Sequence, residues 1–246
     1  MHVANTQYDV VRFVAKKKYN MRLTHADEDD WDLQWIDTNM TPDKLSHMQP
    51  YQKINHYPGM YGLARKNHLG RNLMKMKRIL PHEYRFFPQT WLLPSEYNDF
   101  KAQFNKKKAK TFILKPEASS QGNGIFLTRN IEDVDPNEHL VAQRYMARPL
   151  LIEGLKFDLR IYVLVFGVDP LRIYMFNEGL TRFATELYQS PLQSNLKNLF
   201  MHLTNYAINK NNENFIFNDN ADCDDVGHKR SLSFMWRYLR ERGYDV

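Results

Sequence analysis

Residues 111–130, TFILKPEASSQGNGIFLTRN, contain two short apolar runs separated by a loop that carries two glycines. The runs at residues 112–114 and 125–127 predict two strands, and the loop at residues 117–124 joins them. Because glycine has no Cβ, the backbone N–H groups of such a loop can close over a polyanion. Lys115 would place an ammonium group beside the same anion. A solvent-facing hairpin fits this stretch equally well, since a Gly-x-Gly pattern alone is weak evidence.

A second stretch, residues 156–165 (KFDLRIYVLV), alternates between apolar and charged side chains at its start. A strand with this pattern turns Phe157 and the later odd-numbered residues to a core. It sets Lys156, Asp158 and Arg160 on the opposite face. Such a row is compatible with a surface ladder of weak ion pairs. It is also compatible with a nucleotide site, in which two cations hold phosphates and a carboxylate orients them.

Five sequence blocks follow one another in order along the chain. They are KPEASSQGNGI at 115–125, QRYM at 143–146, KFDLR at 156–160, NEGLTRFA at 177–184 and MHLTNY at 201–206. The set resembles the tubulin–tyrosine-ligase-like family, and its polyglutamylase branch most closely. The resemblance runs from about Trp31, through KINHYPG at 53–59, to GYDV at 243–246.

The resemblance implies a mixed α/β (α+β) chain with an ATP-grasp fold, in which two sheets clamp ATP. We expect a small N-terminal α/β domain at residues 1–61 and a central lobe with the glycine loop at residues 62–150. A partial C-terminal lobe is expected at residues 151–246. No internal repeat is found.

The implied activity is ATP-dependent, ADP-forming ligation that makes an amide bond. The γ-phosphate would activate a glutamate side-chain carboxylate of an acidic protein tail as an acylphosphate, and the amino group of free L-glutamate would then displace phosphate. Tubulin or microtubules are the expected acceptor, which implies a cytoplasmic, cytoskeletal location, extending to the cilium or basal body. A glycine or tyrosine ligase of the same family is the near alternative. We expect a monomer.

The resemblance also assigns residues to roles. The phosphates would be held by Lys115, Gln121, Gly122, Asn123 and Gly124. The adenine would be held, through backbone groups, by Gln143, Arg144, Tyr145 and Met146. The rest of the nucleotide would be contacted by Lys156, Phe157, Asp158, Thr204 and Asn205. Arg160 would stabilise the transferring phosphoryl group, and Gln121 would also contact the acceptor chain. The free amino acid would be bound by Arg182, Tyr206 and Lys229, because cations suit the carboxylates of glutamate.

Several of these residues have simpler interpretations. Lys229 follows an Asn-rich stretch and is compatible with a surface lysine, and Arg182 is compatible with an ion pair to Glu178. His202 could be taken for a general base, but a packed histidine at a helix end is the interpretation we prefer. The group that accepts the proton of the incoming amine is not identified.

Magnesium is implied by the family, but no metal ligand is assigned in this sequence. Family members hold Mg²⁺ with a late Asp and a Glu-x-Asn pair, which follow the region that resembles residues 243–246. Those oxygen ligands anchor the ions that bridge the ATP phosphates. We therefore expect these 246 residues to be a partial ligase, inactive as given, with an exposed sheet edge and apolar surface.

Composition limits the alternatives. The net charge of +6 favours an acidic partner, and nucleic acid and acidic protein tails fit it equally. The aromatic residues lie in apolar strands and are not interleaved with Arg and Lys, so nucleic acid is not expected. From another class, a non-catalytic module could read acidic tails or microtubules through a basic amphipathic helix predicted at residues 62–80. That helix also fits an ordinary solvated surface.

The single cysteine, Cys223, excludes an internal disulfide framework and fits a reducing compartment. No apolar run approaches ~18 residues, so no membrane span is expected. The N-terminus also lacks a signal-peptide pattern.

The remaining pattern predicts further elements. Helices are expected at residues 8–18, 95–105, 194–202 and 231–242, and a helix start at Thr41-Pro42. A strand is expected at residues 31–36 with Trp31 and Trp35 in a core, and an antiparallel hairpin around residues 167–170. Residues 177–184 are expected to leave the sheet, and residues 209–220 to form a loop. Charged turns are expected at residues 27–30 and 106–110.

Overall fold

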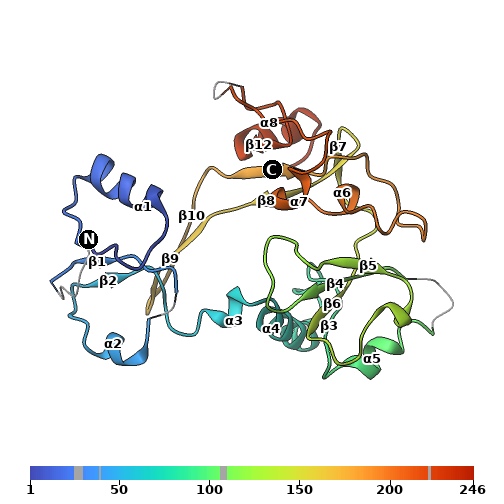
Figure 1. The fold of residues 1–246 in the computed structure, drawn as a ribbon, viewed down its shortest axis with the longest axis horizontal. Helices are drawn as coiled ribbons and strands as arrows, with labels where there is room; N and C mark the ends of the chain where they lie inside the picture. The colour runs from blue at the N-terminus through green and yellow to red at the C-terminus, as the bar shows by residue number, and fades with distance from the viewer. Residues whose placement is uncertain (25–29, 39, 106–109, 221–222) are drawn as a thin grey trace. The chain divides into compact units, whose positions relative to one another are not determined.

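The computed structural model describes residues 1–24, 30–38, 40–105, 110–220 and 223–246, and its chain divides into two compact units, residues 1–69 and 70–246 (Figure 1). The charged turns predicted at residues 27–30 and 106–110 lie outside the described residues, except for Asp30 and Lys110. Each unit is described by itself.

The first unit contains short helices and one small parallel sheet. Its elements are α1 (Asp9–Phe13), a π-helical turn (Val14–Lys18), β1 (Leu33–Gln34), α2 (Pro42–Ser46), β2 (Lys53–Ile54) and α3 (Tyr61–Ala64). β1 pairs with β2 in parallel. The predicted helix start is confirmed, because the Thr41 hydroxyl accepts a hydrogen bond from the Lys44 amide at 3.4 Å and Pro42 begins α2.

The prediction that both tryptophans of this unit are buried is half right. Trp31 is buried, whereas Trp35 is 36% exposed. Gln34 is the residue of β1 that turns inward, and its side chain contacts the His2 ring at 3.0 Å. Since successive strand residues point to opposite sides, its neighbour Trp35 faces out.

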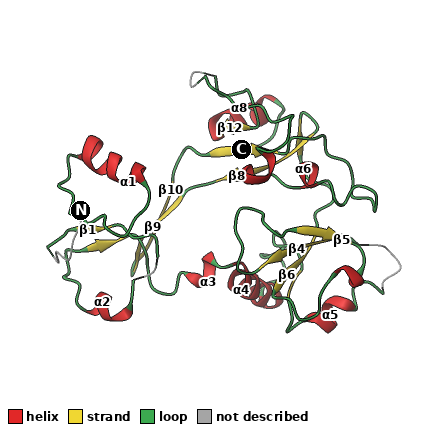
Figure 2. Ribbon diagram, viewed as in Figure 1, coloured by secondary structure: helices red, strands yellow, loops and turns green. Residues whose placement is uncertain are grey.

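The second unit is built on two antiparallel sheets of four strands each (Figure 2). The first sheet has the order β3 (Thr90–Leu92), β6 (Leu140–Arg144), β4 (Phe112–Pro116), β5 (Phe126–Thr128). Its core holds Trp91, Phe100, Phe112 and Leu114, with Phe100 supplied by α5 (Tyr97–Lys101). The two predicted strands on either side of the glycine loop are therefore confirmed.

The second sheet has the order β12 (Lys229–Ser231), β11 (Leu180–Phe183), β8 (Leu155–Arg160), β7 (Leu151–Ile152). One of its faces packs on the helix α8 (Leu232–Glu241) through Ile152, Phe183, Met235 and Leu239. The α8 prediction is confirmed, with the Ser231 hydroxyl accepting from the Phe234 amide at 2.9 Å. The sheet therefore has one face committed to a core.

Other elements complete the second unit. They are α4 (Lys66–Ile79, which begins in the first unit), a 3-10 turn (Ile131–Asp133), β9 (Val163–Val168), β10 (Leu171–Met175), α6 (Leu199–His202) and α7 (Tyr206–Asn209). β9 and β10 form the predicted antiparallel hairpin. A third apolar cluster joins the first sheet to the segment around α6, through Ile113, Leu127, Tyr145, Leu196 and Leu203.

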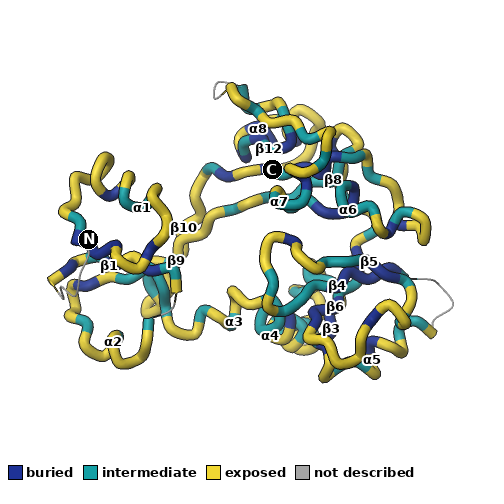
Figure 3. The backbone as a smooth tube through the Cα atoms, viewed as in Figure 1, coloured by how far each residue is buried: buried dark blue, intermediate teal, exposed yellow. Residues whose placement is uncertain are grey.

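Four predictions about elements are wrong in part. Residues 177–184 do not leave the sheet, because β11 pairs with both β8 and β12. The helix predicted at 62–80 is broken at Arg65, whose ψ of 132° is extended. Only the last turn of the helix predicted at 194–202 is helical. The strand predicted from residue 156 ends at Arg160, so Val163 belongs to the hairpin and is 57% exposed rather than buried. Most of the β9–β10 hairpin is exposed (Figure 3).

Candidate functional site

A row of charged side chains crosses the second sheet on the face opposite α8. Arg182 of β11 lies directly across from Lys229 of β12 on one side and from Asp158 of β8 on the other. Directly paired residues of a sheet share a face. Lys156 and Arg160 share that face with Asp158, since they lie two residues to either side of it. The alternation predicted from the sequence is thus confirmed for residues 156–161.

Arg182 and Asp158 form a two-pronged ion pair within this row. The Arg182 Nε donates to Asp158 Oδ1 at 2.8 Å, and its Nη2 donates to Oδ2. The hydrogen bond to Asp158 raises the pKa of Arg182. The alternative pairing with Glu178 is wrong, because the Glu178 carboxylate instead accepts from the Leu232 and Ser233 amides at the start of α8.

A second group of polar side chains lies on the first sheet. Lys115 Nζ donates to Gln143 Oε1 at 2.9 Å, and Gln143 Nε2 donates to Thr90 Oγ1 at 2.9 Å. These bonds tie the lysine to the two neighbouring strands β6 and β3. The role predicted for Gln143 uses only its backbone, whereas the structure shows that its side chain accepts a hydrogen bond from Lys115 and helps to orient it.

Lys156 belongs to the charged row and also lies near enough to Lys115 of the second group to be affected by its charge. Its Nζ donates to the His202 carbonyl at 2.7 Å and to the Tyr145 hydroxyl at 3.2 Å. Burial, and secondarily the charge of Lys115, lower the pKa of Lys156 to about 8, while Asp158 acts in the opposite direction. Two ammonium groups near enough to repel each other are stabilised by an added anion. The arrangement favours a ligand that carries negative charge.

The glycine loop lies against α7 and the residue that precedes it, Asn205. Gly122 has φ +95°, and a Cβ at this position would come within 2.5 Å of Ile208 Cδ1 and 3.1 Å of Asn205 Cγ. The loop of the first sheet and Asn205 are therefore brought together, although they are 83 residues apart (205 minus 122) in the sequence.

Gly122→Ala is expected to move this loop and to weaken any ligand held between the loop and Asn205. A residue with a Cβ is strained in the left-handed backbone conformation, and the new Cβ also displaces Ile208. We therefore expect the free energy of unfolding to fall by ~2 kcal/mol. Gly59→Ala is the matched control, because Gly59 has φ +79° with nothing within 4 Å of its Cβ position. Thermal unfolding of both variants separates the two costs, and equal losses would contradict the close approach at Gly122.

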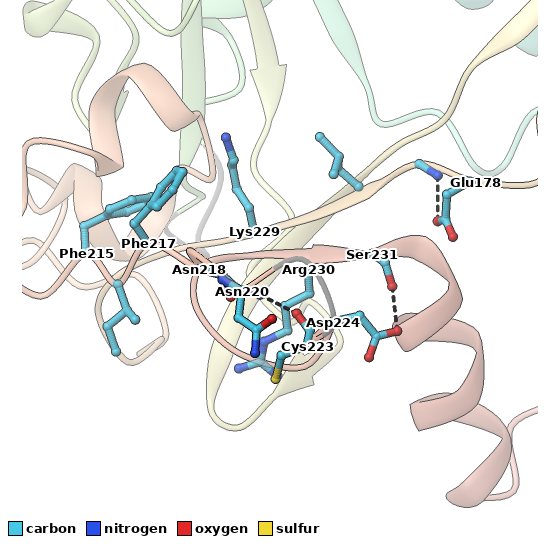
Figure 4. A pocket seen from close by; sticks show the side chains of 13 residues that line it. Glu178, Phe215, Phe217, Asn218, Asn220, Cys223, Asp224, Lys229, Arg230 and Ser231 are labelled. Atoms are coloured by element: carbon cyan, nitrogen blue, oxygen red, sulfur yellow. Dashed lines mark hydrogen bonds between the residues drawn. The ribbon is translucent and has the colours of Figure 1, made fainter.

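Lys229 and Tyr206 lie at the end of the charged row. Lys229 Nζ lies 4.1 Å above the centroid of the Tyr206 ring, an arrangement in which the cation interacts with the ring face. Lys229 also lines a cavity of about 370 Å³, together with Phe215, Phe217, Asn218, Asn220 and Cys223 (Figure 4). The three residues predicted to bind an amino acid thus lie close together, through the Arg182–Lys229 register and the Lys229–Tyr206 contact.

The next residue along β12, Arg230, points to the other side of the sheet (Figure 4). Its guanidinium donates to both carboxylate oxygens of Glu153, at 2.8 and 2.6 Å. It lies between the rings of Phe183, at 4.7 Å, and Phe234, at 5.0 Å. Adjacent cations of one short strand therefore have different surroundings, and only Lys229 belongs to the charged row.

Some predicted residues do not present a side chain to the site. Phe157 packs against Phe183 on the α8 side, with ring centroids 5.9 Å apart. Met146 is 61% exposed. The Arg144 guanidinium lies 5.7 Å from the Phe112 ring centroid, and its Nη1 is buried without a hydrogen-bond partner.

His202 is packed and not placed as a base in contact with solvent. It is fully buried, its Nδ1 lies 2.9 Å from the Tyr145 hydroxyl and its Nε2 lies 3.2 Å from the Asn195 carbonyl oxygen. Burial, followed by the charge of Lys156, lowers the pKa of His202 to about 4. The preferred interpretation of His202 as a packed histidine is confirmed.

This burial predicts a pH dependence of stability. The unfolded chain binds a proton at His202 near the ordinary pKa of 6.5, whereas the folded chain does so only near 4. The unfolded state therefore holds more protons between these values, and the free energy of unfolding falls as the pH drops from 6.5 to 4, by up to ~3 kcal/mol from this residue. Denaturant unfolding of wild type and His202→Asn at a series of pH values isolates the effect. A stability difference between the two proteins that is constant with pH would contradict it.

Within the described residues, no group of three or more His, Cys, Asp or Glu side chains is arranged to hold a metal ion. None of the helices in the described ranges has the length and apolar character needed to cross a membrane.

Comparison with known proteins identifies the family. The model of the tubulin-tyrosine ligase family matches residues 44–246. The chain belongs to this family. It is 58% identical over its whole length to a probable beta-tubulin polyglutamylase of Tetrahymena thermophila, of which it covers 21%. It is 46% identical over its whole length to tubulin polyglutamylase ttll6 of Danio rerio and to tubulin polyglutamylase TTLL13 of Homo sapiens, of which it covers 31% and 29%.

The resemblance to the polyglutamylase branch of this family is therefore confirmed, and the mixed helices and antiparallel sheets fit the expected α+β, ATP-grasp-like fold. The chain spans between about a fifth and a third of the length of these relatives. Ligases of the tubulin-tyrosine ligase family use ATP and Mg²⁺ in general.

Sequence reasoning missed several side chains that shape the site. Asn209, predicted only as part of a loop, is buried and accepts from the Thr185 amide at 3.0 Å and donates to the Leu203 carbonyl at 2.8 Å. It thereby fixes the segment that carries Thr204 and Asn205. The hydroxyl of Tyr145 was missed as well. The sequence contains one indication of a structural role for Asn209, because Asn209 follows Asn205 by four residues, about one helical turn.

Proposed function

We propose that this chain carries the nucleotide and amino-acid sites of an ATP-dependent, amide-forming ligase that adds glutamate to glutamate side chains of acidic protein tails, above all those of tubulin. The observation that carries the proposal is the juxtaposition of two sets of groups. Lys115 and the glycine loop belong to the first sheet, and Lys156 and the row Asp158, Arg182 and Lys229 belong to the second. The names of the relatives support the same activity and acceptor.

The residues present fit a bound nucleoside triphosphate. Gly122 lets the loop backbone approach Asn205 more closely than a residue with a Cβ could, and Lys115 and Lys156 repel each other where phosphate oxygens would relieve that repulsion. We assign the phosphates to Lys115, Gln121, Gly122, Asn123, Gly124 and Lys156, with Asp158, Thr204 and Asn205 beside the nucleotide. The adenine is assigned to the backbone at residues 143–146, at the end of β6. Bound ATP supplies the phosphoryl group that activates the acceptor carboxylate.

Arg160 is assigned to the transferring phosphoryl group. It lies two residues after Asp158 on β8, so it shares the charged face, and it is exposed. Gln121 is assigned to the acceptor chain. For Mg²⁺, the described residues offer no cluster of ligands, so no residue here is given that role. The acylphosphate step requires both anionic substrates to be held in place and their charge to be offset.

Arg182, Tyr206 and Lys229 are assigned to the free amino acid. Two cations favour a substrate with two carboxylates, so glutamate fits this group better than glycine. Lys229 is held by a ring rather than by a carboxylate in its contacts with Tyr206 and Phe217, at 4.1 and 5.8 Å. Its charge therefore stays available for a substrate carboxylate.

The acidic acceptor is assigned to the basic helix α4. Arg71, Lys75 and Arg78 of this helix are exposed, which supports an electrostatic contact with an acidic tail. An acceptor of this kind is found on microtubules in the cytoplasm, including those of the cilium or basal body. We assign the ligase to that setting and treat it as a monomer.

Nucleotide binding is the first test of this proposal. Wild-type chain should bind ATP, and Lys115→Ala should weaken binding by ~30-fold, the loss expected for a charge-assisted contact to phosphate. Lys75→Ala is the matched control, since Lys75 is an exposed lysine of α4 outside the nucleotide site. Equilibrium titration with ATP measures all three. Equal affinities of the two variants would contradict the assignment of Lys115.

A further inference from the structure

One connected set of side chains surrounds Lys156, which is assigned to the phosphates, and includes two buried residues whose side chains have no assigned role. It consists of Tyr145 at the end of β6, Lys156 on β8 and His202 at the end of α6. Tyr145 and His202 are 5% and 0% exposed, so neither can contact an acceptor protein directly. The set joins the first sheet, the second sheet and the α6 segment, which are the three parts between which the nucleotide is assigned.

The direction of the hydrogen bonds in this set follows from the partners. The Nε2 atom of His202 faces the Asn195 carbonyl oxygen at 3.2 Å, and a carbonyl oxygen only accepts, so Nε2 carries the proton. In the neutral ring, Nδ1 is then an acceptor, and the Tyr145 hydroxyl donates to it at 2.9 Å. The oxygen of Tyr145 in turn accepts from Lys156 Nζ at 3.2 Å.

The surroundings keep this set in one protonation state. Burial lowers the pKa of His202 and raises the pKa of Tyr145, so the ring and the phenol both stay neutral near neutral pH. The charged groups that act on Lys156 are Lys115 on β4 and Asp158 on its own strand. The Lys156 ammonium also lies 4.7 Å above the Tyr145 ring centroid. The Lys156 ammonium is therefore held by two neutral acceptors, the Tyr145 hydroxyl oxygen and the His202 carbonyl oxygen, and by the face of the Tyr145 ring.

We propose that Tyr145 and His202 are positioning residues, which fix the Lys156 ammonium beside Lys115 so that both cations meet the same phosphate group of a bound nucleotide. This inference rests on the proposed function, because it names what sets the geometry of an assigned nucleotide contact. A long, flexible lysine loses side-chain entropy when it is immobilised, and contacts made before the ligand arrives reduce that cost at the binding step.

The test compares four variants of the same chain. Tyr145→Phe removes only the hydroxyl, and His202→Phe keeps a ring of similar size but removes the acceptor for that hydroxyl. His202→Asn places an amide oxygen near the position of Nδ1 and should restore the two linked hydrogen bonds, from Lys156 to the Tyr145 hydroxyl and from that hydroxyl to residue 202. We call these two bonds the relay. Leu239→Ala is the control for lost stability alone, because Leu239 is buried on the α8 side of the second sheet.

Titration with ATP gives the first readout. We expect Tyr145→Phe and His202→Phe to weaken ATP binding by about tenfold, the loss expected for one hydrogen bond to a charged group. His202→Asn should recover most of the affinity, and Leu239→Ala should bind like wild type. Wild-type affinity in Tyr145→Phe would overturn the proposal, as would a loss in His202→Asn equal to that in His202→Phe.

A second readout does not depend on nucleotide. The rate at which Lys156 reacts with an acylating reagent, followed at that residue by mass spectrometry over a pH series, reports its titration. Tyr145→Phe should titrate Lys156 at lower pH than wild type, because the ammonium loses an acceptor while its burial remains. An unchanged titration would overturn the relay. If wild type binds no ATP but this shift is present, the proposed function fails and the relay stands.

Discussion

Arg182→Ala is expected to lower the rate of ATP-dependent glutamate incorporation by about 100-fold or more, while the chain stays folded. The substitution removes one of the two cations assigned to the amino acid. It also leaves the Asp158 carboxylate without its two-pronged partner, on the face where anionic substrates are assigned. The measurement is the initial rate of incorporation of labelled glutamate into microtubules, in the full reading frame that contains this chain.

Two further variants sharpen this prediction. Arg172→Ala removes an exposed arginine from the β9–β10 hairpin and should leave the rate unchanged. Arg182→Lys keeps the charge but loses the planar fork, so its rate should lie between those of wild type and Arg182→Ala. Wild-type activity in Arg182→Ala would remove Arg182 from the site and leave it as a structural ion pair.

Glu153→Ala is expected to lower the free energy of unfolding by ~2–3 kcal/mol, because it leaves the Arg230 guanidinium largely buried without its carboxylate. The Arg230 side chain is 9% exposed and the Glu153 side chain 49%, so the cost should fall below that of a fully buried pair. Arg230 would keep the Gly227 carbonyl, to which its Nε donates at 3.0 Å, and the Phe183 and Phe234 rings. Denaturant unfolding measures the change.

The same helix region supplies a matched control. Arg237 of α8 pairs with Asp224 at 2.7 Å, but both side chains are substantially exposed, at 54% and 37%. Arg237→Ala should therefore cost much less stability than Glu153→Ala, as is usual for a surface ion pair. If the two variants lose equal stability, burial of Arg230 does not decide the strength of its ion pair.

The parts of the fold that could be predicted from the sequence have a strong local signal. Alternation over residues 156–161 gave the charged face, and apolar residues recurring on one side of residues 231–242 gave α8. The two apolar runs around the glycine loop gave β4 and β5 for the same reason. In each case the period of the pattern matched the geometry of the element.

The errors arose where distant contacts decide the structure. Residues 177–184 carry glycine and polar residues that are typical of a loop, yet pairing with β8 and β12 makes residues 180–183 a strand. No local pattern indicates that pairing. Gly179 approaches β8 so closely that a Cβ there would lie 2.3 Å from the Arg160 carbonyl oxygen, which explains why this position is a glycine.

In the candidate site, too, the sequence indicated the residues but not the contacts between distant parts of the chain. The types of residue and their order in the chain indicated which side chains to consider. Their partners could not be predicted, because hydrogen bonds such as Tyr145 to His202 join residues 57 apart in the sequence. Gln143 was assigned through its backbone, and its side chain proved to link Lys115 to Thr90.

The most direct test of the ligase assignment is incorporation of labelled glutamate into microtubules with ATP, using the full reading frame that contains this chain. We predict incorporation into intact microtubules, none into microtubules whose acidic tails have been removed, and a strongly reduced rate with Lys115→Ala. Binding to intact tails without any incorporation would contradict the ligase assignment and favour a non-catalytic module that reads acidic tails through α4.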